Sequence, residues 1–153
     1  MTDVELRPCR FQDLGEVGEI EKAAFPDDAY NKSVFLYFLA VARQGFIVAT
    51  YGEQIVGYVI AARQEGQGMI QSIAVAEGVR RQGIGETLMR AAIDHLADNV
   101  ERVYLLVDAK HDDTVKFYRK LGFSDTSRVF RRYYPNGDDA LEMMRELSGK
   151  KPG

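Results

Sequence analysis

The sequence predicts a mixed α/β domain in which helices cover a central sheet. Three observations carry this prediction: short apolar runs typical of strands, longer runs with helical apolar spacing, and the order in which the two kinds occur. From the N-terminus the expected order is β-α-α-β-β-β-α-β-α-β-β. A chain of 153 residues is the usual size of one domain. We therefore expect a single domain over residues 1–147 and a frayed tail over 148–153.

The first half of the chain contains an expected strand, two helices and a hairpin. Residues 4–8 alternate between apolar and polar side chains and predict a short strand. The next segment repeats apolar residues at helical spacing, with Asp13 placed to cap this helix and Pro26 to end it. The other expected elements are a helix over 33–43 and two strands, 46–51 and 55–62, around a turn at 52–53.

The second half alternates strands and helices. Apolar residues recur along one face of the segment 84–97, which predicts an amphipathic helix. The continuous apolar run 103–107 is typical of a central buried strand. Gly122 is a favoured residue just past a helix, and it ends the helix expected over 113–121. The remaining expected strands are 69–76 and a final pair, 128–134 and 141–146, around the turn at 135–137.

Composition and charge argue against several classes of protein. A net charge of −3 disfavours a nucleic-acid partner, which requires an excess of Lys and Arg. No apolar run approaches the ~18–20 residues of a membrane span, and the acidic N-terminus lacks a secretion signal, so we expect a cytoplasmic protein with no membrane partner. With one cysteine and two histidines, we expect no disulfide and no metal site. Cys9 has no histidine nearby in sequence, which favours a small half-buried residue over a nucleophile.

A basic, glycine-bearing loop precedes the helix expected at 84–97. The first turn of a helix has unpaired N–H groups and the positive end of the helix dipole, and both attract phosphate oxygens. Gly83 and Gly85 let the backbone approach a ligand closely, and Arg80 and Arg81 can bind a diphosphate. The loop lacks the lysine of a P-loop and the third glycine of a dinucleotide fingerprint. Taken alone, it fits a phosphate site and a tight loop with solvated arginines equally well.

A second feature is the stretch Phe-Tyr-Arg-Lys-Leu-Gly-Phe at 117–123. Val115, Tyr118 and Leu121 share one helix face, so Tyr118 is expected to point inward with a hydroxyl that needs a partner. One interpretation is a core tyrosine bonded to a backbone carbonyl. The other is a buried phenol that acts as a general acid toward a leaving thiolate.

The two features together resemble the GNAT superfamily of acetyl-CoA-dependent N-acetyltransferases. The resemblance is carried by Arg-x-x-Gly-x-Gly at 80–85 and Phe-Tyr-x-x-x-Gly-Phe at 117–123, and it extends to Leu-Arg-Pro at 6–8 and Ile-Val-Gly-Tyr at 55–58. The stretch 132–143 is similar to the RimI-like and archaeal branch that acetylates protein N-terminal α-amines. The resemblance implies a central, mostly antiparallel sheet with one splayed strand pair and about four flanking helices.

The resemblance also implies a cofactor, acetyl-CoA, with CoA as product, and a direct attack by the bound amine. The cofactor's pantetheine arm would pair with the strand where two strands splay apart. Its pyrophosphate would lie on N–H groups at the start of the following helix, and Tyr118 would protonate the departing thiolate. A backbone N–H near Ile73 would polarise the acyl carbonyl. The residues implied in cofactor binding are Ile73, Ala74, Val75, Arg80, Arg81, Gln82, Gly83, Ile84, Gly85, Glu86 and Thr87.

The sequence departs from this branch at the positions of its usual general bases. Members of this branch usually have the sequence Leu-Glu-Val-Arg-x-x-Asn, whereas this chain has Leu-Leu-Val-Asp-Ala-Lys-His at 105–111. Leu106 therefore replaces the glutamate, Asp108 the arginine and His111 the asparagine. Related enzymes carry a tyrosine or histidine in the preceding strand, where this chain has Met69.

Another group must then take the acceptor's proton, or the amine must arrive neutral. An α-amine with a pKa of ~8 is partly neutral at physiological pH, whereas a lysine amine near ~10.4 is not, which favours an α-amine. Asp27 is one candidate base, although Asp27 and Asp28 also fit a solvated loop or a cap for the next helix. His111 is the other candidate, and it also fits a simple loop residue before a helix. Glu65 and Gln71 are weaker candidates.

The acceptor is expected to be a protein or peptide N-terminus. Phe25, Tyr30, Tyr133 and Tyr134 are the residues expected to line its groove, although the last two also fit sheet packing. Two other functions stay open: an acetyltransferase for a lysine side chain or a small amine, and a non-catalytic acyl-CoA-binding module. The protein is expected to be a monomer or a homodimer.

Overall fold

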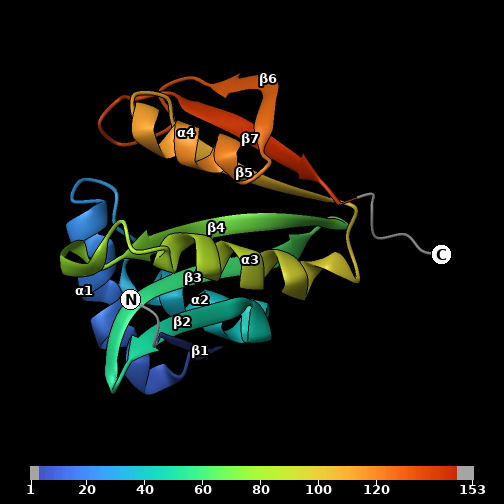
Figure 1. Ribbon diagram of the computed structural model, residues 1–153. Helices are drawn as coiled ribbons and strands as arrows, with labels where there is room; N and C mark the ends of the chain where they lie inside the picture. The colour runs from blue at the N-terminus through green and yellow to red at the C-terminus, as the bar shows by residue number, and fades with distance from the viewer. Residues whose placement is uncertain (1–3, 148–153) are drawn as a thin grey trace.

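The computed structural model describes residues 4–147, and the expected tail at 148–153 lies outside the described residues. Seven strands form one sheet, and four α-helices flank it (Figure 1). In chain order the main elements are β1 Glu5–Pro8, α1 Leu14–Ala24, α2 Lys32–Ala42, β2 Phe46–Tyr51, β3 Gln54–Gln64, β4 Gln67–Val75, α3 Ile84–Ala97, β5 Arg102–Asp108, α4 Asp112–Lys120, β6 Ser124–Phe130 and β7 Ala140–Glu146. Short 3-10 turns, η1 Phe11–Asp13, η2 Arg43–Gly45 and η3 Glu77–Val79, lie between them.

The strand order is β1-β2-β3-β4-β5-β7-β6, and every neighbouring pair is antiparallel except β4 and β5. These two parallel strands pair only over Gly68–Ile70 and Val103–Leu105. Beyond that point β4 continues to Val75 and β5 to Asp108 as they separate (Figure 1). The expected sheet with one splayed pair and four flanking helices is confirmed.

Two apolar layers hold the helices against the sheet. On one face α3 and α4 bury side chains such as Leu88, Met89 and Val115. On the other face α1 and α2 bury Val17 and Phe35 against β2 and β3. Each fully buried side chain of this size contributes about 1.5–3 kcal/mol relative to an exposed one. The amphipathic patterns therefore fix which helix face meets the sheet.

A β-bulge in β4 lies next to the splay. Ile60 pairs with Ser72 and Ala61 with Ile70, so Gln71 is an extra residue with no counterpart on β3. A bulge of this kind changes the direction of neighbouring side chains and bends the strand. The bulge thus shapes β4 just where it leaves β5.

The prediction that Asp13 caps the first helix is wrong. Its carboxylate accepts two hydrogen bonds from the Arg7 guanidinium, at 2.7 and 3.0 Å, and one from the Arg10 backbone N–H at 2.8 Å. The charged Arg7 side chain holds the Asp13 carboxylate back toward β1 and η1, so α1 begins without a side-chain cap. The cap of α2 is Asn31, whose side chain accepts from the Val34 N–H at 3.1 Å, and neither Asp27 nor Asp28 takes that role.

The sixth strand lies four residues earlier than the expected 128–134. It spans Ser124–Phe130, pairs only with β7, and is interrupted by a bulge between Asp125 and Val129. An edge strand with mostly exposed side chains has no clear alternation of apolar and polar residues, which explains why its position was predicted wrongly. The strand ends at Phe130, Arg132 follows with a φ of 52°, and the chain turns through Tyr134 toward β7.

Candidate active site

A cleft of about 490 Å³ opens where β4 and β5 separate. Its walls come from α1, the segment between α1 and α2, β4, β5, the start and middle of α4, and the loop before β7. Residues expected for cofactor binding, acceptor binding and catalysis therefore share one cavity. The expected residues among its lining are Phe25, Tyr30, Ile73, Ala74, Val75, Arg80, His111, Tyr118 and Tyr134.

The β4 wall offers backbone groups for a ligand. Ile73, Ala74 and Val75 pair with β3 on one side, opposite Val59 and its neighbours. On the other side the pairing with β5 has already ended at Ile70. An extended arm can therefore bond to this edge as an added strand would.

The start of α3 combines a left-handed glycine with nearby arginines. Gly83 precedes the helix with a φ of 84°, a left-handed conformation that glycine adopts without strain. A Cβ at Gly85 would lie 3.3 Å from the Phe117 ring, so a larger residue here would press against α4. Arg80 lines the cleft and donates from Nε to the Val75 carbonyl oxygen at 3.1 Å. The other expected phosphate-binding residues lie at this helix start, outside the cleft lining: Arg81, Gln82, Ile84, Glu86 and Thr87.

Tyr118 reaches the cleft from α4. Its side chain packs beside the rings of Phe117 and Phe123, at centroid distances of 5.5 and 6.1 Å. Within residues 4–147 its hydroxyl has no hydrogen-bond partner, which argues against a core tyrosine bonded to a backbone carbonyl. Burial raises the pKa of Tyr118, so the phenol stays protonated at neutral pH.

The expected acceptor residues lie at the other end of the cleft. The Tyr30 hydroxyl donates to the Gln71 carbonyl oxygen at 3.0 Å. Tyr133 lies in an adjoining hollow of about 290 Å³ with Tyr134, and their rings meet edge to face at 5.0 Å. Met69, at a position where the family resemblance implied a base, also lines this hollow.

The two candidate bases lie in different surroundings. His111 lines the cleft, with its Nε2 4.0 Å from an Asp108 carboxylate oxygen. Asp27 is exposed and does not line it. Its neighbour Asp28 does, with one carboxylate oxygen buried and unbonded among the described residues. Burial and the negative charges of Asp27 and Asp138 raise the pKa of Asp28.

Asp108, at the end of β5, is buried beside a second carboxylate. Burial raises its pKa, and a hydrogen bond shared with Asp138 raises it further while lowering the pKa of Asp138. Lys110 donates its N–H to Asp108 at 2.9 Å and places its ammonium 3.3 Å from Asp138. Of these groups, Asp108 lines the cleft together with His111, and Asp138 does not.

Sequence reasoning missed Glu21, which is only 2% exposed and lines the same cleft. One carboxylate oxygen accepts from the Tyr58 hydroxyl and from Ser72 Oγ at 3.1 Å, and the other accepts from the Tyr30 N–H at 3.0 Å. The available signal was its place in α1, directly after Ile20 and four residues after Val17 on the buried face. An acidic residue on the apolar face of a helix marks a polar site inside the fold.

Two kinds of site were not found in the described chain. No cluster of His, Cys, Asp and Glu side chains over residues 4–147 could bind a metal ion. In the same region no helix is long and apolar enough to span a bilayer. Cys9 is buried, and burial raises its pKa to about 12.

Comparison with known proteins places this geometry in one family. Residues 14–123 match the acetyltransferase (GNAT) family. The chain is 31% identical to an N-alpha-acetyltransferase of Sulfurisphaera tokodaii, with 95% of this chain and 94% of that protein covered. Ard1 from Thermoplasma volcanium superposes with a TM-score of 0.90 at 26% identity, covering 95% and 98% of the two chains. Naa50 from Arabidopsis thaliana, solved with the bisubstrate analogue CoA-Ac-MVNAL, gives a TM-score of 0.83 at 25% identity, covering 95% and 99%. The splayed strands, the glycine-bearing start of α3 and these likenesses agree: the chain belongs to the acetyltransferase (GNAT) family.

Proposed function

We propose that this protein transfers an acetyl group from acetyl-CoA to the α-amine of a protein or peptide N-terminus. The observation that carries the proposal is the single cleft between β4 and β5. One end lies beside Arg80 and the start of α3, and the other is lined by the carboxylates of Glu21, Asp28 and Asp108. Such a cleft fits an anionic cofactor at one end and a cationic amine at the other.

The relatives support the α-amine as acceptor. The archaeal protein at 31% identity is named an N-alpha-acetyltransferase. The bisubstrate analogue in Naa50 joins CoA through an acetyl group to the peptide sequence MVNAL. In this chain, Phe25, Tyr30, Tyr133 and Tyr134 surround the corresponding end of the cleft. We propose that they hold the first residues of the acceptor.

The residues present fit acetyl-CoA, which when bound supplies the acetyl group as a reactive thioester. The free edge of β4 at Ile73, Ala74 and Val75 would hold the pantetheine arm. The N–H groups at the start of α3, from Gln82 to Glu86, would hold the pyrophosphate with Arg80 and Arg81 beside it.

Two residues are proposed to handle protons. The Tyr118 hydroxyl has no partner among the described residues and faces the cleft, so it can donate its proton to the departing sulfur. Of the two bases expected from the sequence, His111 lines the cleft and Asp27 does not. This favours His111 as the group that carries the acceptor's proton toward solvent, since 55% of its side chain is exposed.

Free-thiol release from acetyl-CoA tests the proposal, with short peptides of varied first residue, lysine peptides blocked at the N-terminus, and polyamines as acceptors. We expect turnover only with peptides that have a free N-terminus. Turnover confined to lysine peptides or polyamines would contradict the α-amine assignment. Tight CoA binding with no turnover on any amine would favour an acyl-CoA-binding module. Cell fractionation and sizing would test the expected cytoplasmic location and the monomer or homodimer.

A further inference from the structure

We infer that Glu21 is the carboxylate that binds the ammonium group of the acceptor and takes its proton. The inference rests on the proposed function and names a base for it. The positions that hold a base in similar enzymes carry Leu106 and Met69 here, and neither side chain can accept a proton. Glu21 lies on a different element, α1, and reaches the same cleft from the side of the acceptor residues.

The contacts of Glu21 hold its carboxylate in one place. Tyr58 donates from β3, Ser72 from β4, and the Tyr30 N–H from the segment after α1. Ser72 Oγ and the Tyr58 hydroxyl lie 3.0 Å apart, side by side against the same carboxylate oxygen. Three separate elements therefore fix one carboxylate beside the bulge of β4. This rigidity is what a base requires if it is to meet an amine in a defined position.

The charge of Glu21 has no protein counterion. Its three partners are neutral donors, and within residues 4–147 it forms no ion pair with Lys, Arg or His. Burying a carboxylate without a cation is costly. A carboxylate can accept about four hydrogen bonds, so three donors leave one position free. Since Glu21 lines the cleft, an ammonium group in the cleft would supply both the missing hydrogen bond and the missing charge.

The two phenols beside Glu21 remain neutral hydrogen-bond donors. Burial and the adjacent carboxylate raise the pKa of Tyr58 well above its usual value and that of Tyr30 to about 12, so both phenols stay protonated. The other charged groups that line the same cleft are Asp28, Asp108, Asp113, His111 and Arg80. Among the acceptor residues the cleft lining is therefore acidic, which attracts a cation rather than repelling it.

The proton balance is simple. The acceptor ammonium gives one proton to a Glu21 oxygen and becomes a neutral amine. The amine nitrogen forms the new bond to the acetyl carbon as the carbon–sulfur bond breaks, and the sulfur takes the proton of the Tyr118 hydroxyl. The second proton lost by the nitrogen returns to the Tyr118 oxygen through solvent, and Glu21 releases its proton to solvent by way of His111, the proposed carrier in the same cleft.

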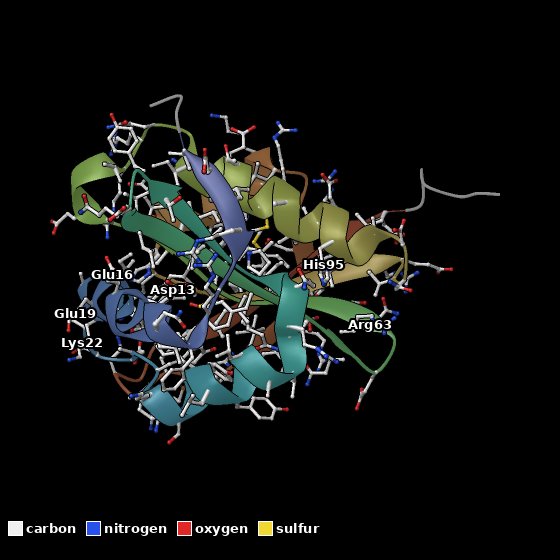
Figure 2. All side chains as sticks on the ribbon, turned by 90° about the horizontal axis from the view of Figure 1, so that it is seen from below. Asp13, Glu16, Glu19, Lys22, Arg63 and His95 are labelled. Atoms are coloured by element: carbon white, nitrogen blue, oxygen red, sulfur yellow. The ribbon has the colours of Figure 1, made fainter. Side chains whose placement is uncertain are left out.

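The test compares Glu21→Gln with Glu19→Gln, which makes the same change on the same helix. Figure 2 shows Glu19 with Glu16 and Lys22 on the outer side of α1, and Glu19 is not among the residues that line the cleft. We expect Glu21→Gln to lower kcat/KM for a free-N-terminal peptide by about 10²–10⁴-fold, the usual range for a lost general base. Its Kd for acetyl-CoA should stay within about threefold of wild type, and Glu19→Gln should match wild type in both measurements.

A pH profile separates a base from a structural residue. If Glu21 takes the proton, the defect of Glu21→Gln should shrink above pH ~8, where the α-amine is already neutral. A loss of equal size at every pH, or a rate within threefold of wild type, would overturn the inference. A large loss in the His111→Gln variant, with Glu21→Gln unaffected, would assign the base to His111 instead.

A second measurement covers the case in which Glu21→Gln does not fold. With wild-type protein and CoA, a peptide that lacks only its α-amino group should bind at least tenfold more weakly than the amino peptide, and Glu21→Asp, which keeps the charge, should preserve that preference. Equal binding of the two peptides would overturn the inference. If wild type acetylates only a different amine, the proposed function fails, and the same comparison with that amine still tests Glu21.

Discussion

The Tyr30 hydroxyl donates a hydrogen bond to the carbonyl oxygen of Gln71 at 3.0 Å. Gln71 is the extra residue of the β4 bulge, so this bond ties the segment after α1 to the strand beside the splay. The acceptor end of the cleft is thereby joined to the strand proposed to hold the cofactor.

Removing that hydroxyl should weaken acceptor binding selectively. One hydrogen bond of this kind contributes about 1 kcal/mol, so we expect Tyr30→Phe to raise KM for the peptide about fivefold. The KM for acetyl-CoA should not change, because the start of α3 is untouched. Steady-state kinetics with each substrate varied checks this, and Tyr37→Phe, exposed on α2, is the matched control. An equal rise in both KM values would show a general disturbance of the fold.

Tyr118→Phe should lower kcat by about 10²–10⁴-fold with little change in folding or CoA binding. The hydroxyl has no partner among residues 4–147, so its loss breaks no hydrogen bond of the fold, and only the proton donor disappears. Single-turnover kinetics and thermal melting measure the two effects. Tyr104→Phe, on β5 and outside the cleft lining, should behave as wild type. An unchanged kcat in Tyr118→Phe would remove its proposed role.

Arg80→Gln should weaken acetyl-CoA binding about tenfold or more, because a charge-assisted hydrogen bond contributes about 1.5–3 kcal/mol. The affinity of the variant should also depend less on salt, since a charge that salt would screen is gone. Titration calorimetry at two salt concentrations measures both effects. Arg63→Gln is the control, since Figure 2 shows Arg63 near the β3–β4 turn, far from α1. If Arg80→Gln and Arg63→Gln bind acetyl-CoA with equal affinity, the phosphates of the cofactor bind elsewhere.

Asp13→Asn should destabilise the fold by about 2–3 kcal/mol at pH 7, because it removes a charged partner from Arg7 and Arg10. The Arg7 guanidinium lowers the pKa of Asp13 in the folded protein. The carboxylate therefore stabilises the fold above its unfolded pKa of ~3.9, and this contribution disappears as the pH falls through the lower folded value. Urea unfolding at pH 7 and below pH 4 should show the two proteins converging in acid. Glu16→Gln, exposed on the same helix, should change stability by less than about 0.5 kcal/mol.

Asp108→Asn should have the opposite effect on stability and raise the melting temperature at pH 7. The pKa of Asp108 is raised by burial and by the bond shared with Asp138. The folded state thus binds a proton more tightly than the unfolded state, and wild type loses stability as the pH rises through that interval. An asparagine keeps an oxygen for the Lys110 N–H but carries no charge. Melting curves at pH 4 and pH 7 should show the gain only at pH 7, and a lower melting temperature at pH 7 would contradict this account.

Much of the fold was predictable because its signals are local. The apolar spacing in 84–97 and the continuous run at 103–107 each depend on a few neighbouring residues, and both elements formed where expected. The start of α3 was also visible, because Gly83 takes a left-handed conformation that glycine adopts without strain. The edge strand β6 was misplaced because a strand with one neighbour and solvent on most sides needs no alternation of apolar and polar side chains.

The sequence by itself determined the element order, the glycine-bearing start of α3 and the inward position of Tyr118, since periodicity and glycine chemistry act over a few residues. Only the tertiary structure decided which acidic groups meet the acceptor. It placed Asp27 outside the cleft and Asp28 inside it, and it brought Glu21 together with Tyr58 and Ser72, 37 and 51 residues away in sequence. Whether a carboxylate is solvated or buried against distant donors depends on how sheets and helices pack, and no local pattern records that.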